Sequence, residues 1–337
     1  MNRSRTIFRP RLALVVLCCV LFPLPSHAQD RKPNSSDRDR GIELYRQQRT
    51  SEAIAALRRV VAADKKDQEA WYYLGLAQIQ ADDFKAASKS LETALALQPA
   101  FASAHAALAY ALLQRNKIEE AAREAQRAIA LDATNADAHY ILGMTRMGAG
   151  ANAEAVELAD KAIKLRPDFA AAYLLKAQGL LALIAGPPPG KADGAMLAPK
   201  GRQSQAAEAL EKYLQLAPNA PRKEFWRAQL EALKRPQPTV GQIFRSSEVS
   251  TRARILNKPE PSYTDEARYY GVKGTVVLRA VFAADGTVRN IVVLRGLPHG
   301  LSEVCVEAAR KIKFVPATLN GQPVSTWMQL EYNFMIG

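Results

Sequence analysis

The sequence predicts an α-helical repeat domain followed by a small α+β domain with an antiparallel sheet. Small residues recur every 34 residues through the middle of the chain, a spacing typical of stacked helical hairpins. From about residue 255 the hydrophobic pattern changes from helical to alternating, which indicates strands. The 337 residues suffice for two or three domains. A content of 48% hydrophobic and 23% charged residues excludes a collagen-like, fully disordered or multi-span membrane protein.

The N-terminal segment has the three parts of an export signal. A basic stretch, Arg3–Arg11, precedes the apolar run Leu12–Phe22, and Ser26–Ala28 supplies small residues at the −3 and −1 positions of a cleavage site. The apolar run is too short to cross a bilayer, which takes about 20 residues. We therefore expect residues 1–28 to be a signal peptide and the protein to be periplasmic. The alternative is an uncleaved segment that anchors the chain in the inner membrane.

The net charge of +13 favours anionic partners or surfaces. Export argues against nucleic acid as that partner. Two basic pairs, Arg222-Lys223 and Lys234-Arg235, could contact a membrane surface, although solvated helix ends would have the same composition. Once the leader is removed, Cys305 is the one cysteine left, so no intramolecular disulfide is expected.

Two sets of small residues share the 34-residue spacing. They are Ala53, Ala87, Ala121 and Ala155, and Gly41, Gly75, Ala109 and Gly143. A small side chain is needed where the two helices of a hairpin approach most closely, and a proline then ends the second helix. The fifth repeat is interrupted by a Gly- and Pro-containing insertion, residues 186–204, which we expect to be a surface loop or a contact loop for a partner. Residues 222–233 predict a final capping helix.

Residues 34–234 resemble the tetratricopeptide repeat family, with about five repeats and a capping helix. The resemblance implies a right-handed superhelix whose first helices line a concave groove that binds a peptide or protein segment. The family's groove positions correspond here to Tyr72, Tyr110, Tyr140, Met144 and Met147. Tyrosine offers contact area with a polar tip, and methionine adapts to varied shapes. The alternative for each residue is packing between repeats.

His105 and His139 occupy the same repeat position, which is also that of Trp71. Two histidines 34 residues apart could suggest a metal site. We find no carboxylate or thiol placed to complete it, so we expect no metal and assign both histidines to packing positions.

After a Pro- and Ser-containing linker, residues 235–254, the C-terminal domain spans 255–337. Its expected elements are a short helix capped by Ser262 or Thr264, a hairpin of Thr275–Phe282 and Thr287–Leu294 around Asp285-Gly286, a helix from Leu301 to Ile312, and a long last strand, Val324–Phe334. Thr275–Phe282 is expected to be half-buried, with Thr275 and Arg279 on its polar face.

Short motifs follow one another in this domain. They are Glu260-Pro261-Ser262-Tyr263, Gly271-Val272-Lys273-Gly274, Asp285-Gly286-Thr287-Val288, Phe314-Val315-Pro316-Ala317 and Gly321-Gln322-Pro323-Val324. Over about 80 residues, they resemble the TonB C-terminal domain, which grips outer-membrane transporters. In that family the last strand adds to an extended peptide of the transporter, and the Pro-x-Tyr segment touches that peptide. The corresponding edge residues here are Val324, Thr326, Trp327, Met328, Gln329, Leu330, Glu331 and Tyr332. The corresponding motif residues are Pro261, Ser262, Tyr263 and Thr264.

Strand addition has a simple physical basis. An unpaired strand edge offers main-chain N–H and C=O groups to an extended peptide, and side chains at alternate positions give selectivity. In the last strand, the outward side chains would include Trp327, which we expect to be a contact anchor. Its alternative role is to cover one face of the sheet.

The motifs of common enzymes and cofactor sites are absent from the sequence. Cys305 lies on an apolar helical stripe, typical of a buried thiol. We therefore predict a non-enzymatic periplasmic adaptor without a cofactor, in which the repeats bind one protein and the C-terminal domain binds an outer-membrane transporter or similar partner. The main alternative is a membrane-tethered energy transducer of the TonB type. A third, a hydrolase, could be hosted only by Cys305 or the 186–204 loop.

Overall fold

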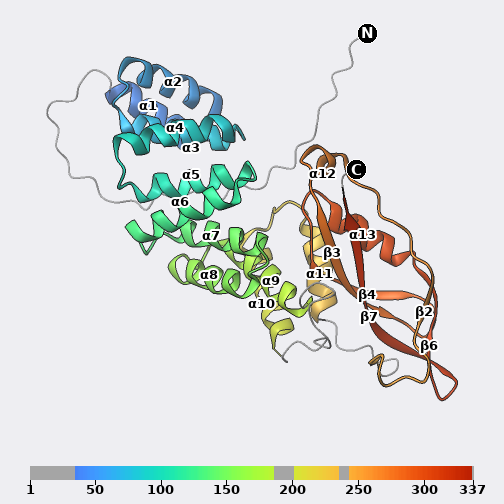
Figure 1. Ribbon diagram of the computed structural model, residues 1–337. Coiled ribbons are helices and arrows are strands. Elements are labelled where there is room, and N and C mark those ends of the chain that lie inside the picture. The colour runs from blue at the N-terminus through green and yellow to red at the C-terminus, as the bar shows by residue number, and fades with distance from the viewer. Residues whose placement is uncertain (1–34, 186–200, 235–242, 336–337) are drawn as a thin grey trace, which may run out of the picture. The chain divides into compact units, whose positions relative to one another are not determined.

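The computed structural model describes residues 35–185, 201–234 and 243–335 (Figure 1). The chain divides into two units, Met1–Leu175 and Lys176–Gly337. The predicted signal peptide, most of the predicted insertion and the first part of the predicted linker lie outside the described residues.

The first unit is a series of antiparallel helices, and from α1 to α8 each helix packs on the next. Its elements are α1 (Ser35–Arg46), α2 (Thr50–Ala63), α3 (Gln68–Gln80), α4 (Phe84–Leu97), α5 (Ala102–Gln114), α6 (Ile118–Leu131), α7 (Ala136–Gly148), α8 (Asn152–Leu165) and the start of α9 (Ala170–Ala185). Helices two apart also touch, since α3 contacts both α1 and α5. This arrangement confirms the predicted helical repeat. In the described ranges, none of the helices combines the length and apolar character needed to span a membrane.

The small residues lie where paired helices cross. A Cβ added to Gly75 would stand 2.5 Å from Cγ of Leu91, and one added to Gly41 would stand 2.7 Å from Cγ of Leu57. Both leucines are fully buried. Because real Cβ atoms do not approach other atoms so closely, a larger side chain would separate the two helices of the hairpin.

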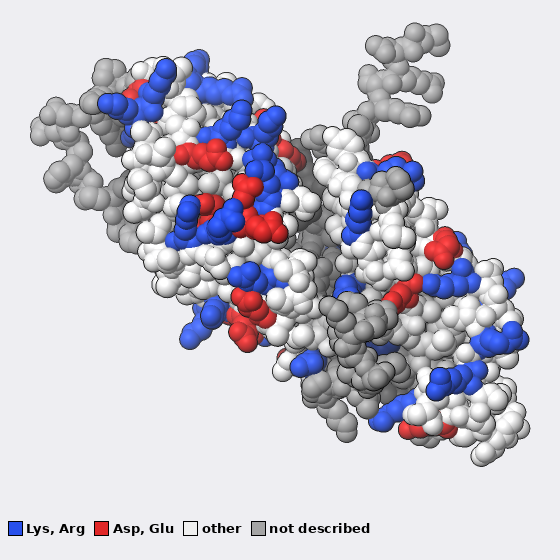
Figure 2. All heavy atoms as spheres, in the orientation of Figure 1, with Lys and Arg blue, Asp and Glu red and all other residues white. Residues whose placement is uncertain are grey.

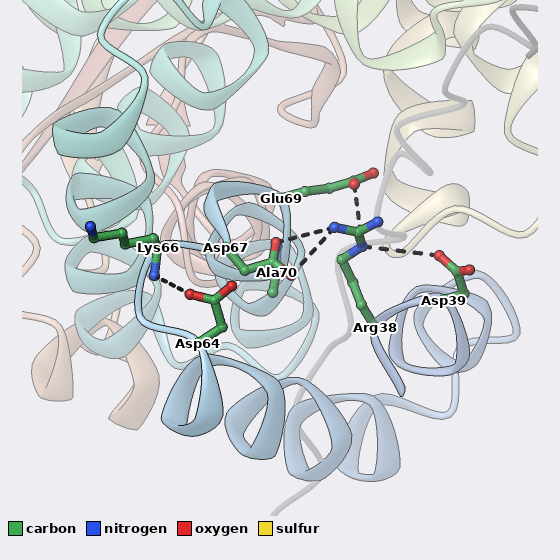
Figure 3. Close-up of polar contacts among 7 residues, drawn as sticks. All are labelled: Arg38, Asp39, Asp64, Lys66, Asp67, Glu69 and Ala70. Atoms are coloured by element: carbon green, nitrogen blue, oxygen red, sulfur yellow. Dashed lines mark hydrogen bonds and ion pairs between the residues drawn. The ribbon is translucent and has the colours of Figure 1, made fainter. Parts of the chain in front are cut away.

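One side-chain cap and two ion pairs fix the start of α3. Asp67 accepts a hydrogen bond from the main-chain N–H of Ala70 at 2.9 Å, which satisfies one free donor of the first turn. Arg38 of α1 reaches the same carboxylate at 3.3 Å and Glu69 at 3.4 Å (Figure 3). These contacts tie the first hairpin to the second. Asp83 and Asn135 cap α4 and α7 in the same way.

One repeat position supplies the same hydrogen bond four times. Residues 71, 105, 139 and 173 each donate to the main-chain carbonyl six residues earlier. The pairs are Trp71 to Lys65 at 3.0 Å, His105 to Pro99 at 2.9 Å, His139 to Ala133 at 3.0 Å and Tyr173 to Pro167 at 3.1 Å. The position thus takes any ring that carries an N–H or O–H donor, and it holds the loop between repeats.

The second unit contains the end of α9, two further helices and the C-terminal sheet with its own two helices. Its elements are α10 (Arg202–Leu216), α11 (Lys223–Lys234), β1 (Ile243–Phe244), β2 (Arg254–Asn257), α12 (Asp265–Tyr269), β3 (Gly274–Phe282), β4 (Val288–Arg295), α13 (Leu301–Arg310), β5 (Lys313–Val315), β6 (Ala317–Leu319) and β7 (Gln322–Phe334). The main sheet has the order β1-β7-β3-β4, with β6 beside the start of β7, while β2 and β5 form a separate ribbon. All pairs are antiparallel except β1 with β7. The predicted α+β fold is thus confirmed, and Thr264 provides the predicted cap of α12.

The middle strands β3 and β4 are largely buried on both faces. On one face, α13 contributes Leu301 and Cys305 to a core with Phe282 and Tyr332. On the other face, Val277, Val281 and Val292 are also almost fully buried. The expectation of a half-buried strand with one polar face is therefore wrong. Continuous apolar runs such as Val276–Leu278 and Ile291–Leu294 are typical of strands covered on both faces.

The helix crossing at Gly75 gives the first prediction. Gly75→Ala should destabilise the protein by about 1–3 kcal/mol, because the added methyl group meets buried Leu91. Gly148→Ala is the matched control, since nothing lies within 4 Å of its added Cβ and alanine favours the helix by about 0.5–1 kcal/mol. Urea unfolding measures both. Equal stabilities of the two variants would contradict the close approach.

Candidate protein-binding site

The last strand, β7, is flanked differently on its two edges. Along one edge, β3 pairs with it from Thr326 to Phe334. Since β3 takes that edge at Thr326, β1 pairs with Ser325 and Thr326 on the second edge. From Trp327 to Phe334, no strand among the described residues pairs with this second edge. It therefore presents main-chain groups that an added strand could bind.

The chain itself supplies a strand partner for two of the predicted edge residues. Val324 pairs with Ala317 of β6, and Thr326 pairs with Phe244 of β1 as well as with β3. A guest strand has no room beside Thr326. The open part of the edge carries the other predicted residues, Trp327, Met328, Gln329, Leu330, Glu331 and Tyr332.

Lys258 contacts the open edge at Glu331. Its Nζ donates to the main-chain oxygen of Glu331 at 2.5 Å and lies 4.3 Å from the ring centroid of Tyr332. Because β3 covers the first edge along this stretch, we infer that the Glu331 oxygen points to the second edge. Residues two apart in a strand direct their main-chain groups to the same edge, so those of Gln329 and Asn333 point there as well.

Trp327 lies on the sheet face opposite α13, and it is half-buried. The guanidinium of Arg279 stacks on its ring, 4.9 Å from the centroid. Arg279 in turn donates to Oε1 of Gln203 in α10 at 2.9 Å, and burial lowers the pKa of its guanidinium. The anchor role of Trp327 stays a prediction, because the ring also contributes to the covered face.

Two residues of the predicted motif segment, Tyr263 and Thr264, make contacts within their own domain. The Tyr263 hydroxyl donates to the main-chain oxygen of Val272, and its ring packs edge-to-face on Phe334 with centroids 5.2 Å apart. Thr264 caps α12 and donates to the main-chain oxygen of His299 at 2.6 Å. Pro261 is half-buried and Ser262 is exposed, so these two have surface free for a partner.

A helix closes the opposite edge of the sheet, at β4. Gln229 of α11 is 2% exposed, and its side-chain amide faces this edge. Its Oε1 accepts from the main-chain N–H of Val293 at 2.7 Å, and its Nε2 donates to the oxygen of Ile291 at 3.5 Å. One primary amide thus supplies the donor and the acceptor that a neighbouring strand would supply.

Further contacts attach α11 to the C-terminal domain. Arg222, just before the helix, pairs with Glu303 of α13, and Phe225 packs against the core beneath α13. On α10, Gln203 accepts from Arg279 of β3 and donates to the oxygen of Leu233. The two helices and the sheet therefore form one packed body.

In the first unit, the predicted groove residues have mixed surroundings. Tyr72 is 5% exposed and packs on Phe101, with centroids 4.7 Å apart, and Tyr140 packs on Phe169 at 5.0 Å. Tyr110 packs edge-to-face on Phe84, and burial, aided by Asp82, raises its pKa to about 12. Met144 and Met147 are half-buried. The three tyrosines pack against neighbouring aromatic residues, and Tyr72 has little surface left for a partner.

Family comparisons match both parts of the chain. The model described as Gram-negative bacterial TonB protein C-terminal matches residues 259–336. The tetratricopeptide repeat model matches residues 38–87, 76–138 and 106–168. The chain thus contains tetratricopeptide repeats followed by a TonB C-terminal domain. Both resemblances predicted from the motifs are thereby confirmed.

Solved structures similar to this chain include repeat proteins. The MamA protein is 25% identical, with a TM-score of 0.42, and the match covers 55% of this chain and 92% of that one. A thermophilic tetratricopeptide repeat protein of Thermus thermophilus is 18% identical over 59% of this chain and 98% of its own, with a TM-score of 0.45. Pseudomonas aeruginosa pilF is also 18% identical, with a TM-score of 0.47 over 59% and 85%. Among curated proteins, none matches the chain.

Catalytic chemistry has little support in the TonB C-terminal domain. Cys305 is fully buried, and burial raises the pKa of its thiol to about 12, so it stays protonated at neutral pH. In the described part of the chain, no three His, Cys, Asp or Glu side chains gather as a metal site would require. Both matched families are in general non-enzymatic.

Three features of the structure were not predicted from the sequence. A carboxylate does lie beside one of the paired histidines, since Oε2 of Glu124 is 2.6 Å from Nδ1 of His105. Residues 243–244, in the predicted linker, form β1. The packing of α11 on β4 was also missed, although the apolar run Ile291–Leu294 indicates a covered strand.

The contact between α11 and β4 yields the second prediction. Gln229→Leu should destabilise the protein by about 1–3 kcal/mol, because it leaves a buried N–H of Val293 and a buried C=O of Ile291 without partners. Gln205→Leu on the exposed face of α10 is the control and should change stability by less than about 0.5 kcal/mol. Chemical denaturation measures both, and amide exchange at Val293 should accelerate only in Gln229→Leu. Unchanged exchange there would rule out the edge-closing role.

Proposed function

We propose that the protein is a non-enzymatic adaptor of the cell envelope that holds an extended segment of another protein along β7. The open edge from Trp327 to Phe334 supports this proposal, together with the match to the TonB C-terminal family. Main-chain hydrogen bonds would provide affinity, and side chains at alternate positions would provide selectivity. The guest we favour is a segment of an outer-membrane transporter or a similar envelope protein.

The repeats would bind a second protein. Tetratricopeptide repeats are in general protein-interaction modules. Of the predicted groove residues, the three tyrosines pack on neighbouring rings, whereas Met144 and Met147 keep adaptable, partly exposed side chains, so we favour the methionines for contact. An adaptor of this kind would bring the protein held by its repeats to the protein held by its last strand.

We place the protein in the periplasm, because its first residues have the pattern of a cleavable export signal. On the face drawn in Figure 2, basic and acidic side chains are interspersed over the repeat helices rather than gathered into a broad basic area. This face therefore gives little support to contact between the basic residues and a membrane surface.

The third prediction concerns strand addition. Gln329→Pro removes a main-chain donor from the open edge and leaves the side that pairs with β3 intact. Gln329→Ala keeps the donor and is the matched control. The probes are synthetic extended peptides from the outer-membrane transporters of the same organism. Peptides that bind wild type should bind Gln329→Pro at least tenfold more weakly and Gln329→Ala with little change. Equal binding to both folded variants, checked by circular dichroism, would exclude strand addition at β7.

The fourth prediction concerns the N-terminus. Intact mass of the protein recovered from cells should show a chain that begins at Gln29, because the small residues before it form the cleavage site. Replacing Ala28 with a bulky residue, as in Ala28→Leu, should block this cleavage. A wild-type mass that retains residues 1–28 would instead favour the tethered energy transducer.

A further inference from the structure

Two histidines of the first unit stand at the same repeat position and share one hydrogen bond. His105 lies in the first turn of α5 and His139 in the first turn of α7, and each is 7% exposed. Nε2 of His105 lies 2.9 Å from the main-chain oxygen of Pro99, and Nε2 of His139 lies 3.0 Å from that of Ala133. Because a carbonyl oxygen only accepts hydrogen bonds, Nε2 carries a proton in both rings.

The second ring nitrogen distinguishes the two histidines. Nδ1 of His105 lies 2.6 Å from Oε2 of Glu124 in α6. Nδ1 of His139 is buried and, within the described part of the chain, has no hydrogen-bond partner. One repeat after Glu124 the residue is Leu158, which is 6% exposed. A leucine therefore occupies the position at which the preceding repeat has a carboxylate.

The two acceptors around His105 require two ring protons. With Nε2 donating to Pro99, a neutral imidazole has a lone pair on Nδ1, and this lone pair would face the negative oxygen of Glu124. A second proton, on Nδ1, turns this repulsion into a charge-assisted hydrogen bond. We place the proton on the ring because imidazole is a stronger base than a carboxylate. His139 faces no second acceptor among the described residues, so one proton on Nε2 suffices there.

The other charged groups around His105 are compatible with a positive ring. In the described ranges, the cleft that holds the ring is also lined by Glu92 of α4 and by Arg127 of α6. Arg127 donates to Oε1 of Glu124 at 2.8 Å, which leaves Oε2 for His105. The Arg127 side chain is 64% exposed, so solvent screens its charge. Glu92 is exposed and adds a negative charge to the same cleft.

We propose that His105 and Glu124 form a pH-sensitive contact at the junction of the second and third repeats, made while both ring nitrogens are protonated and weakened when Nδ1 loses its proton. The ring bonds the loop between α4 and α5 through Pro99 and bonds α6 through Glu124, so it joins the two repeats. Folding provides an acceptor for the second proton. The contact therefore stabilises the junction fully below about pH 6.5, where histidine is ordinarily charged, and this stabilisation is lost as the pH rises above neutrality.

The test uses the full-length protein and the next repeat as a guide. Glu124→Leu gives His105 the residue that Leu158 supplies one repeat later. Glu124→Gln removes the charge at nearly constant size and serves if the leucine variant is unstable. Glu119→Gln removes the same charge from an exposed position on α6 and is the matched control. Nuclear magnetic resonance of isotope-labelled histidine reports whether each ring nitrogen carries a proton, and His105→Gln and His139→Gln assign the two rings.

At about pH 7, wild type should show protons on both nitrogens of His105 and on Nε2 alone in His139. Both Glu124 variants should convert His105 to the form of His139, whereas Glu119→Gln should leave it unchanged. A second readout is exchange of the His105 main-chain N–H, which donates to the oxygen of Phe101 at 3.1 Å. After correction for the intrinsic pH dependence, its protection should fall at least about threefold between about pH 6 and pH 8 in wild type and stay constant in the Glu124 variants.

A wild-type His105 ring with a single proton at this pH would overturn the proposal. Two protons that persist in both Glu124 variants would overturn it as well, because the carboxylate would then not be their cause. Equal protection of the His105 amide at the two pH values in wild type would show that the second proton does not strengthen the junction, and the proposed pH sensitivity would fall.

Discussion

Main-chain groups at the rim of a sheet must find partners, and the second unit meets this requirement in three different ways. At β4, the amide of Gln229 replaces a neighbouring strand. At the start of β7, the short strand β1 pairs with Ser325 and Thr326. Along the rest of β7, no strand of the described chain is present, and the contact at Glu331 comes from a lysine side chain. The protein closes the edge at β4 with a buried side chain, whereas most of the edge at β7 pairs with no strand of the described chain. This difference fits a binding role for the β7 edge.

The elements with strong local patterns were predictable from the sequence. The 34-residue period placed the repeats because small residues are required wherever two helices cross, as at Gly75 beside Leu91. The hairpin of β3 and β4 followed from Asp285-Gly286, and Thr264, one of the two residues predicted to cap α12, is its cap. In each case, the physical cause lies within a few residues of the chain, or one repeat away.

Contacts between segments distant in sequence were not predictable in the same way. The bond of Gln229 to β4 joins residues 64 positions apart, and glutamine at that place has no pattern that distinguishes it from a solvated residue. The pairing of β1 with β7 involves two residues, too few for any periodicity. Tyr72 and Tyr140 stand at groove positions of the family. Their rings, however, pack on aromatic residues at the start of the next repeat, Phe101 and Phe169.

The attachment of α11 to β4 has a consequence for how the protein is divided. The family match begins at residue 259, whereas the packed body that contains the sheet includes α10 and α11. A fragment that begins at the family boundary would lack α11, which covers the edge of β4. The main-chain groups of that edge would then be exposed without partners. Two such fragments could join through their bare edges, so a soluble and monomeric piece of this protein has to begin upstream of Gln203.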